Sequence, residues 1–118
     1  MSSRCLAGEP LSLIPEPICI SAGVSQVCTG YYIDPARPLK LTRLRWRTAK
    51  PGLQLHRFTV GRFDMGASDT MCIELSECGV WRFPPVTVLA ADRVGAVIYN
   101  WSAANVLLLE LSAWGVPT

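Results

Sequence analysis

Residues 39–47, LKLTRLRWR, and residues 53–60, LQLHRFTV, carry the pattern that decides the fold. In each stretch apolar residues stand at the first, third, sixth and eighth positions, and polar or charged residues fill the places between them. Alternation with period two is typical of a half-buried strand, and the single slip in the middle indicates a β-bulge. Because the two slips match, we expect these strands to be neighbours in one sheet, joined by a turn at Pro51-Gly52.

Further short apolar runs follow, separated by turn residues and by Pro84-Pro85. They predict strands at residues 71–75, 86–90, 94–99 and 106–111, and a short piece at residues 79–83 that leads to Pro84-Pro85. Residues 103–111 also contain good helix formers, but their apolar residues lie on both faces, which favours a buried strand. Short strands at intervals of about 8 to 12 residues, without an amphipathic helix between them, predict an all-β antiparallel sandwich or barrel.

Residues 1–38 differ from the rest, because they hold five of the nine prolines and lack a sustained apolar period. Only residues 17–21 look like a strand, so we expect an extended N-terminal arm over 1–38 and a β-sandwich domain over 39–118. The arm has apolar residues but no pattern for burying them internally, and we expect them to contact neighbouring subunits. The residues concerned are Leu11, Leu13, Ile14, Ile18 and Ile20.

The composition sets outer limits on function. In a chain of 118 residues, 50% are hydrophobic and 17% charged, which indicates one folded domain rather than disorder. A net charge of +2 does not indicate nucleic acid or an anionic membrane as the main partner. No apolar run reaches the roughly 18 residues of a transmembrane helix, and prolines and Glu9 interrupt any signal-peptide core near the start.

The five cysteines form an odd set without a Cys-x-x-Cys pair. We interpret them as free thiols in a reducing compartment, although Cys72 and Cys78 are close enough to pair under oxidising conditions.

Groups that carry catalysis are few. His56 is the only histidine, and no nucleophile elbow, phosphate loop or metal motif accompanies it. Asp64, Asp69, Glu74 and Glu77 are close enough in sequence to form a cation loop, but their spacing matches no EF-hand and solvated loop carboxylates are the commoner outcome. We expect a non-enzymatic protein with no cofactor and no metal.

A basic stretch and four tryptophans are the remaining candidates for binding. Seven of the eleven positive charges fall within residues 40–62, and we expect Arg43, Arg45 and Arg47 to form a solvated or partner-facing strip. Nucleic acid is the less favoured partner, because Trp46 falls on the apolar phase of its strand and supplies no stacking surface. Trp81 and Trp101 lie near predicted turns, where they could contact a protein partner or stack on a sugar.

The segment 39–46, together with 94–102, 106–111 and Trp114-Gly115, resembles the small jelly-roll virion proteins of bacteriophages. That resemblance implies a jelly-roll sandwich without catalytic residues. It also implies a capsid decoration or minor virion protein, assembled in the host cytoplasm, with other virion subunits and further copies of itself as partners. The alternative from another class is a carbohydrate-binding β-sandwich that uses Trp81 or Trp101.

Overall fold

The computed structural model describes residues 9–32, 38–61, 63–64, 73–89 and 92–117. These residues form strands and turns, with no helix among them. The strands are β1 (Glu9–Ser12), β2 (Ile18–Ile20), β3 (Ser25–Tyr31), β4 (Leu39–Thr48), β5 (Leu53–Val60), β6 (Phe63–Asp64), β7 (Ile73–Leu75), β8 (Cys78–Val88), β9 (Arg93–Asn100) and β10 (Val106–Pro117).

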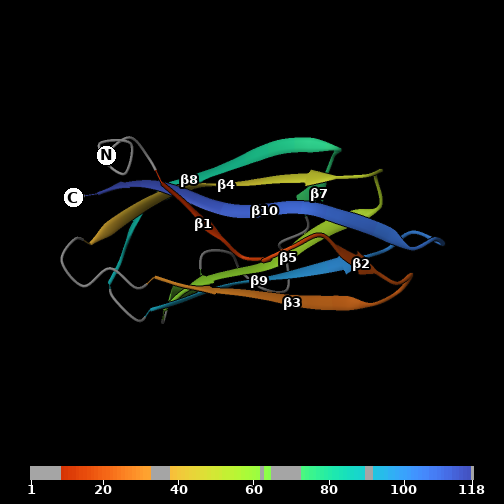
Figure 1. Ribbon diagram of the computed structural model, residues 1–118, viewed down its shortest axis with the longest axis horizontal. Helices are drawn as coiled ribbons and strands as arrows, with labels where there is room; N and C mark the ends of the chain where they lie inside the picture. Colours follow the sequence, from red (N-terminus) through yellow and green to blue (C-terminus); the bar gives the residue numbers. More distant parts are fainter. Residues whose placement is uncertain (1–8, 33–37, 62, 65–72, 90–91, 118) are drawn as a thin grey trace.

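The strands make two antiparallel sheets that pack face to face (Figure 1). The first, called sheet A, has the order β1-β10-β4-β8, with β2 pairing further along β10. The second, called sheet B, has the order β3-β9-β5-β6, with β7 also pairing β5. The expected antiparallel β-sandwich is confirmed, and so is the choice of a strand over a helix at residues 106–111.

The strand pairings are nested, because strands near the start of the chain pair with strands near its end. The first strands, β1 and β2, pair with the last strand β10, and β3 pairs with β9. Moving inward along the chain, β4 pairs with β8, and β5 pairs with β6 and β7. In addition, β4 pairs with β10 and β5 with β9, so each sheet contains strands from both halves of the chain.

Both slips predicted from the sequence are present as irregularities in the strand register. The shift lies between Leu41 and Arg43 in the pairing of β4 with β8, and between Leu55 and Arg57 in the pairing of β5 with β9. The expectation that these two strands pair with each other is wrong, because β4 lies in sheet A and β5 in sheet B. Alternation shows which face of a strand is buried, but it does not identify the neighbouring strand.

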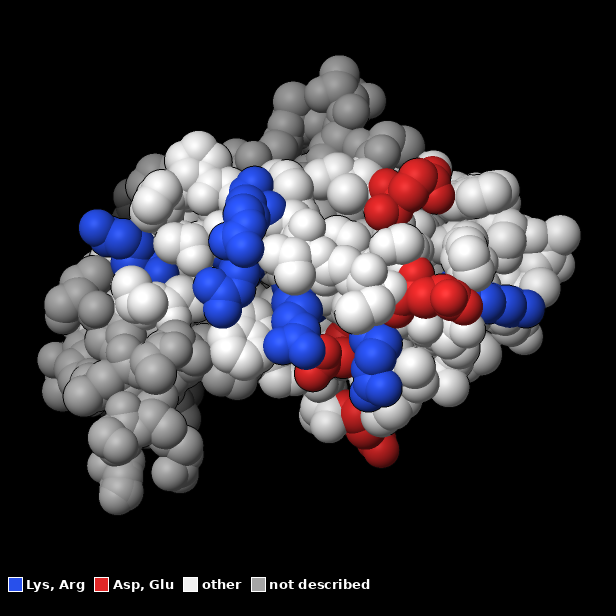
Figure 2. Space-filling view, turned by 90° about the horizontal axis from the view of Figure 1, so that it is seen from above, with Lys and Arg blue, Asp and Glu red and all other residues white. Residues whose placement is uncertain are grey.

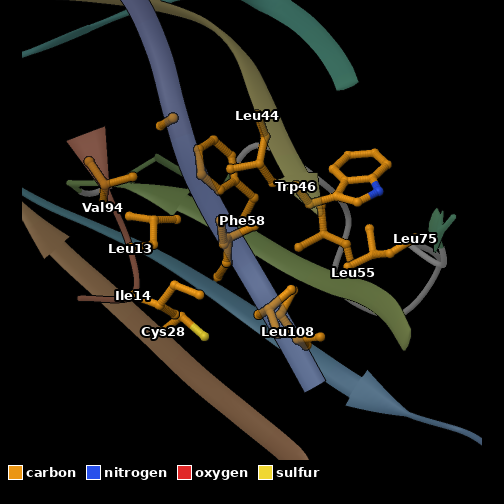
Figure 3. Close-up of a cluster of buried hydrophobic side chains, with 14 of the residues drawn as sticks. Leu13, Ile14, Cys28, Leu44, Trp46, Leu55, Phe58, Leu75, Val94 and Leu108 are labelled. Carbon is orange, nitrogen blue, oxygen red and sulfur yellow. The ribbon is translucent and has the colours of Figure 1, made fainter. Parts of the chain in front are cut away.

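The N-terminal segment differs from the expected extended arm with one short strand. The predicted strand at residues 17–21 is present as β2, but β1 and β3 accompany it, and all three pair with strands of this chain. Leu13 is only 2% exposed, and Figure 3 shows it among core side chains such as Phe58 and Val94. The segment therefore builds one edge of the sandwich and part of its core.

Strand β8 runs through Pro84-Pro85, whereas the sequence predicted a strand only at residues 86–90, after a short piece at 79–83. Leu41 pairs with Val86 and Arg43 with Arg82, so three residues of β8 bulge out opposite Thr42. β8 is also the last strand of sheet A in the described order. Proline, which lacks an amide hydrogen, is tolerated at such a bulge and on an edge strand.

The core fills the space between the sheets. It combines alternate residues of β4 and β10 from sheet A with alternate residues of β5 and β9 from sheet B. Trp46 is buried, and its indole Nε1 donates to the carbonyl oxygen of Ser76 at 3.1 Å. In the part of the chain that the structure describes, no helix is long and apolar enough to cross a membrane.

Candidate functional site

The outer face of sheet A carries the basic strip predicted from the sequence. Residues of β4 on the opposite phase from Leu44 and Trp46 face solvent, and Arg82 on β8 pairs with Arg43 in the register. Figure 2 shows Lys and Arg side chains spaced along the molecule, with Asp and Glu gathered toward one half. The cations of this face are Lys40, Arg43, Arg45, Arg47 and Arg82.

Trp114 of β10 lies beside this strip. The register places it opposite Arg43, and the guanidinium carbons of Arg43 and Arg45 lie 5.3 and 5.6 Å from the centre of its ring. The indole Nε1 donates to Ser112 Oγ at 2.8 Å, and Arg45 Nε lies 3.8 Å from Glu110 Oε1. Cation–π contacts of this kind hold both arginines over the face, where they present positive charge in a fixed place.

Two apolar side chains share this face with the cations. Val80 pairs with Arg45 and Val116 with Lys40, and each is about half exposed. Tryptophan and arginine beside exposed aliphatic groups are the side chains enriched where protein surfaces meet. We call the set Arg43, Arg45, Arg82, Trp114, Val80 and Val116 the Arg–Trp face.

The apolar partner-binding candidates of the N-terminal segment are not on the surface. Leu13, Ile14 and Ile20 are buried, whereas Leu11 and Ile18 are half-buried and pack against the same core. A partner could reach the buried three only if the sandwich opened. The expectation of partner contact is corrected for Leu13, Ile14 and Ile20, because their side chains are buried in the core of this chain and β1 and β2 pair with its own β10.

The two tryptophans proposed for sugar binding lie in different surroundings. Trp81 is half-buried, with its ring centre 5.8 Å from that of Phe58 and 5.2 Å from that of Phe83. Trp101, between β9 and β10, is 51% exposed, and its Nε1 donates to Glu74 Oε1 at 3.1 Å. Of these two, Trp101 is the one with an accessible indole.

Glu74 also takes part in a polar row across sheet B. Gln54 Nε2 donates to Glu74 Oε2, and Gln54 Oε1 lies 2.9 Å from His56 Nε2. The His56 ring centre lies 5.0 Å from that of Tyr99. The single histidine is thus held at the bulge of β5 by neighbours from two strands.

A hollow opens on the outer face of sheet B where β9 lacks a side chain at Gly95. Thr59 of β5 and Thr29 of β3 flank this glycine in the register. The hollow has a volume of about 260 Å³, and Arg57 and Arg93 also line it.

Other sequence candidates give no site. Asp69 and Cys72 lie outside the described residues, as does the side chain of Asp64, and the described part of the chain contains no group of three residues suited to a metal.

Cys19 and Cys78 are exposed free thiols and Cys28 is a buried one. Burial raises the pKa of the Cys28 thiol from 9.0 to about 11.

No protein-family model matches this chain, and no curated protein matches it in sequence.

Two features of the surface were missed in the sequence. Trp114 lies beyond the strand predicted at residues 106–111, although the small residues on either side of it, Ala113 and Gly115, fit a strand that continues past Leu111. Gly95 stands in the apolar run 94–99 and was counted as part of an ordinary strand. A glycine inside a strand often marks close approach of another group, which was the available signal.

Proposed function

We propose that this chain is a non-enzymatic structural subunit of a viral particle, a bacteriophage capsid decoration or minor virion protein that acts by protein–protein assembly. The observation that carries the proposal is the Arg–Trp face, with Trp114 beside Arg43 and Arg45 on a solvent-facing sheet. This surface is already ordered before a partner arrives, which lowers the entropy lost on association.

The connectivity supports the same proposal. A jelly roll is expected to pair its first strand with its last, its second with its second last, and so on inward, and the pairings of this chain follow that order. Viral capsid proteins use this fold, and so do lectins. Fold alone does not define function, so the proposal depends on the surface rather than on the roll.

The partner surface is acidic in this proposal. The strands of sheet A present five cations on their outer face, of which Arg45 has Glu110 within salt-bridge distance. Carboxylates of a neighbouring subunit would complement them, and Val80 and Val116 would be covered at the same time.

The test uses density-gradient purified particles from the cells in which the chain is made. We expect mass spectrometry to find the chain in the particle fraction at a constant ratio to the major subunit. The double variant Arg43→Ser with Trp114→Ser is expected to stay folded but leave that fraction, whereas the control Arg57→Ser on the other sheet remains in it. A folded wild-type chain absent from the particles would refute the proposal.

A further inference from the structure

We propose that the outer face of sheet B holds a binding site for a carboxylated sugar residue, in the hollow over Gly95. This site lies on the opposite side of the sandwich from the Arg–Trp face and is independent of the assembly function.

The floor of the hollow exists because residue 95 has no side chain. A Cβ placed there would lie 3.3 Å from Thr59 Oγ1, so even a methyl group would begin to fill the space. The neighbouring positions in the register, Thr29 and Thr59, place one hydroxyl-bearing side chain on each side of the floor. Threonine hydroxyls both donate and accept hydrogen bonds, as sugar hydroxyls do.

Two arginines stand at opposite ends of the hollow. On the outer face of β9, Val97 and Arg93 are the neighbours of Gly95, two residues away on either side. Arg57 of β5 pairs with Val97, so Arg57 and Arg93 lie on opposite sides of Gly95 along the strand direction. Their positions along the sheet differ by four residues, or roughly 13 Å at about 3.3 Å per residue, and both line the hollow. Arg57 has an interaction elsewhere in the chain, so Arg93 is the arginine that the proposal assigns to the ligand. A guanidinium group binds a carboxylate through two parallel hydrogen bonds, so an anionic ligand fits here better than a neutral one.

The remaining surroundings favour a sugar ring over a small inorganic anion. Val27 and Val97 form an apolar side of the hollow, and exposed Tyr31 stands beside Arg93 in the register. A pyranose ring has an apolar face that packs on such groups, while an inorganic anion gains nothing from them. A volume of about 260 Å³ lies just below the usual range for drug-sized ligands, which suits one sugar residue.

The test is a titration of the full, 15N-labelled chain with sodium glucuronate, with glucose and with inorganic phosphate at matched ionic strength. We expect glucuronate to shift the amide signals of Thr29, Thr59 and Gly95 with a dissociation constant on the order of 1 mM. Glucose is expected to bind at least tenfold more weakly. Phosphate binding as tight as glucuronate, or no shift at these amides, would overturn the proposal.

Three variants separate the site from the fold. Arg93→Gln removes one charged donor and is expected to weaken glucuronate binding roughly tenfold to a hundredfold. Gly95→Thr fills the hollow with a residue that suits strands, and binding is expected to disappear. Arg82→Gln removes an exposed arginine from sheet A, so the glucuronate affinity should not change. If Gly95→Thr does not fold, Arg93→Gln decides, and unchanged affinity in Arg93→Gln rules the site out.

Discussion

At the scale of single residues, the buried thiol of Cys28 links stability to pH. Its pKa is raised from 9.0 to about 11 by burial. Below pH 9 both folded and unfolded chains keep the thiol proton, and Cys28 adds no pH dependence. Between about pH 9 and 11 the unfolded chain loses that proton while the folded chain retains it, so the free energy of unfolding falls as pH rises.

The comparison with Cys28→Ala isolates this effect from the titration of lysines and tyrosines. Urea melts at pH 8 and pH 10.5 should show a larger loss of stability for the wild-type chain than for the variant. Equal losses would contradict the assignment.

In the folded chain at pH 8, Cys19 and Cys78 should react with a thiol reagent long before Cys28, because they are exposed.

Asn100 is a second residue on which the fold depends. Its side chain is fully buried, and Nδ2 donates to the carbonyl oxygens of Ile20 and Ala104, each at 2.8 Å. Its Oδ1 accepts from the amide and the hydroxyl of Ser102 at 2.9 and 2.7 Å. One side chain therefore joins β2 to the turn between β9 and β10.

We expect Asn100→Ala to lower the free energy of unfolding by about 3 kcal/mol or more, because several buried polar groups would lose their partner. Asn105→Ala is the matched control, since Asn105 is exposed and accepts one hydrogen bond, from Ala22 N at 3.2 Å. Its cost should stay below about 1 kcal/mol. Chemical denaturation of both variants measures the difference, and similar costs would mean that Asn100 has no special role.

At the scale of strands, the N-terminal segment is part of the sandwich. A chain that begins at Ser25 would lack β1, β2 and the buried side chains of Leu13, Ile14 and Ile20. Deleting one large buried aliphatic side chain typically costs about 2–5 kcal/mol, so the loss of three costs roughly 6–15 kcal/mol, as much as the whole stability of an ordinary domain.

We therefore expect a chain of residues 25–118 to show no cooperative thermal unfolding by circular dichroism. The full chain of 118 residues is the control and should melt cooperatively. If residues 25–118 melted at the wild-type temperature, the N-terminal segment would after all be a separable arm.

The strands themselves were accessible to sequence analysis, but most of their partners were not. Leu41 and Leu44, and likewise Leu55 and Phe58, mark the bulges correctly because a slip changes which face each residue takes. Strand pairing depends on contacts between residues far apart in the chain. The local alternation of apolar and polar residues gives no information about those contacts. For the same reason the strip of arginines was found in the sequence, whereas Trp114, which comes to it from β10, was not placed there.

At the scale of the whole molecule, the fold pairs the first described strand, β1, with the last, β10. Glu9 of β1 pairs with Gly115 of β10, so this pairing joins two residues that are separated by almost the whole length of the chain. Closing so long a loop costs conformational entropy before any contact is gained, and sheets dominated by such pairings fold in milliseconds to seconds.

A circular permutant tests whether this closure limits folding. In this permutant a linker of about four residues joins Pro117 to Glu9, a length within the usual range for a β-hairpin loop. The new chain ends lie between Lys50 and Pro51, in the exposed turn between β4 and β5. Joining β10 to β1 makes their pairing local, so we expect tryptophan fluorescence in a stopped-flow experiment to show faster refolding than in a linear chain of residues 9–117. The permutant also cuts the chain between β4 and β5. These two strands lie in different sheets and do not pair with each other, so the cut removes no strand pairing. A permutant that folds to the same stability but no faster would show that the slow step is the pairing of the inner strands, β4 with β8 and β5 with β9, rather than the meeting of the ends.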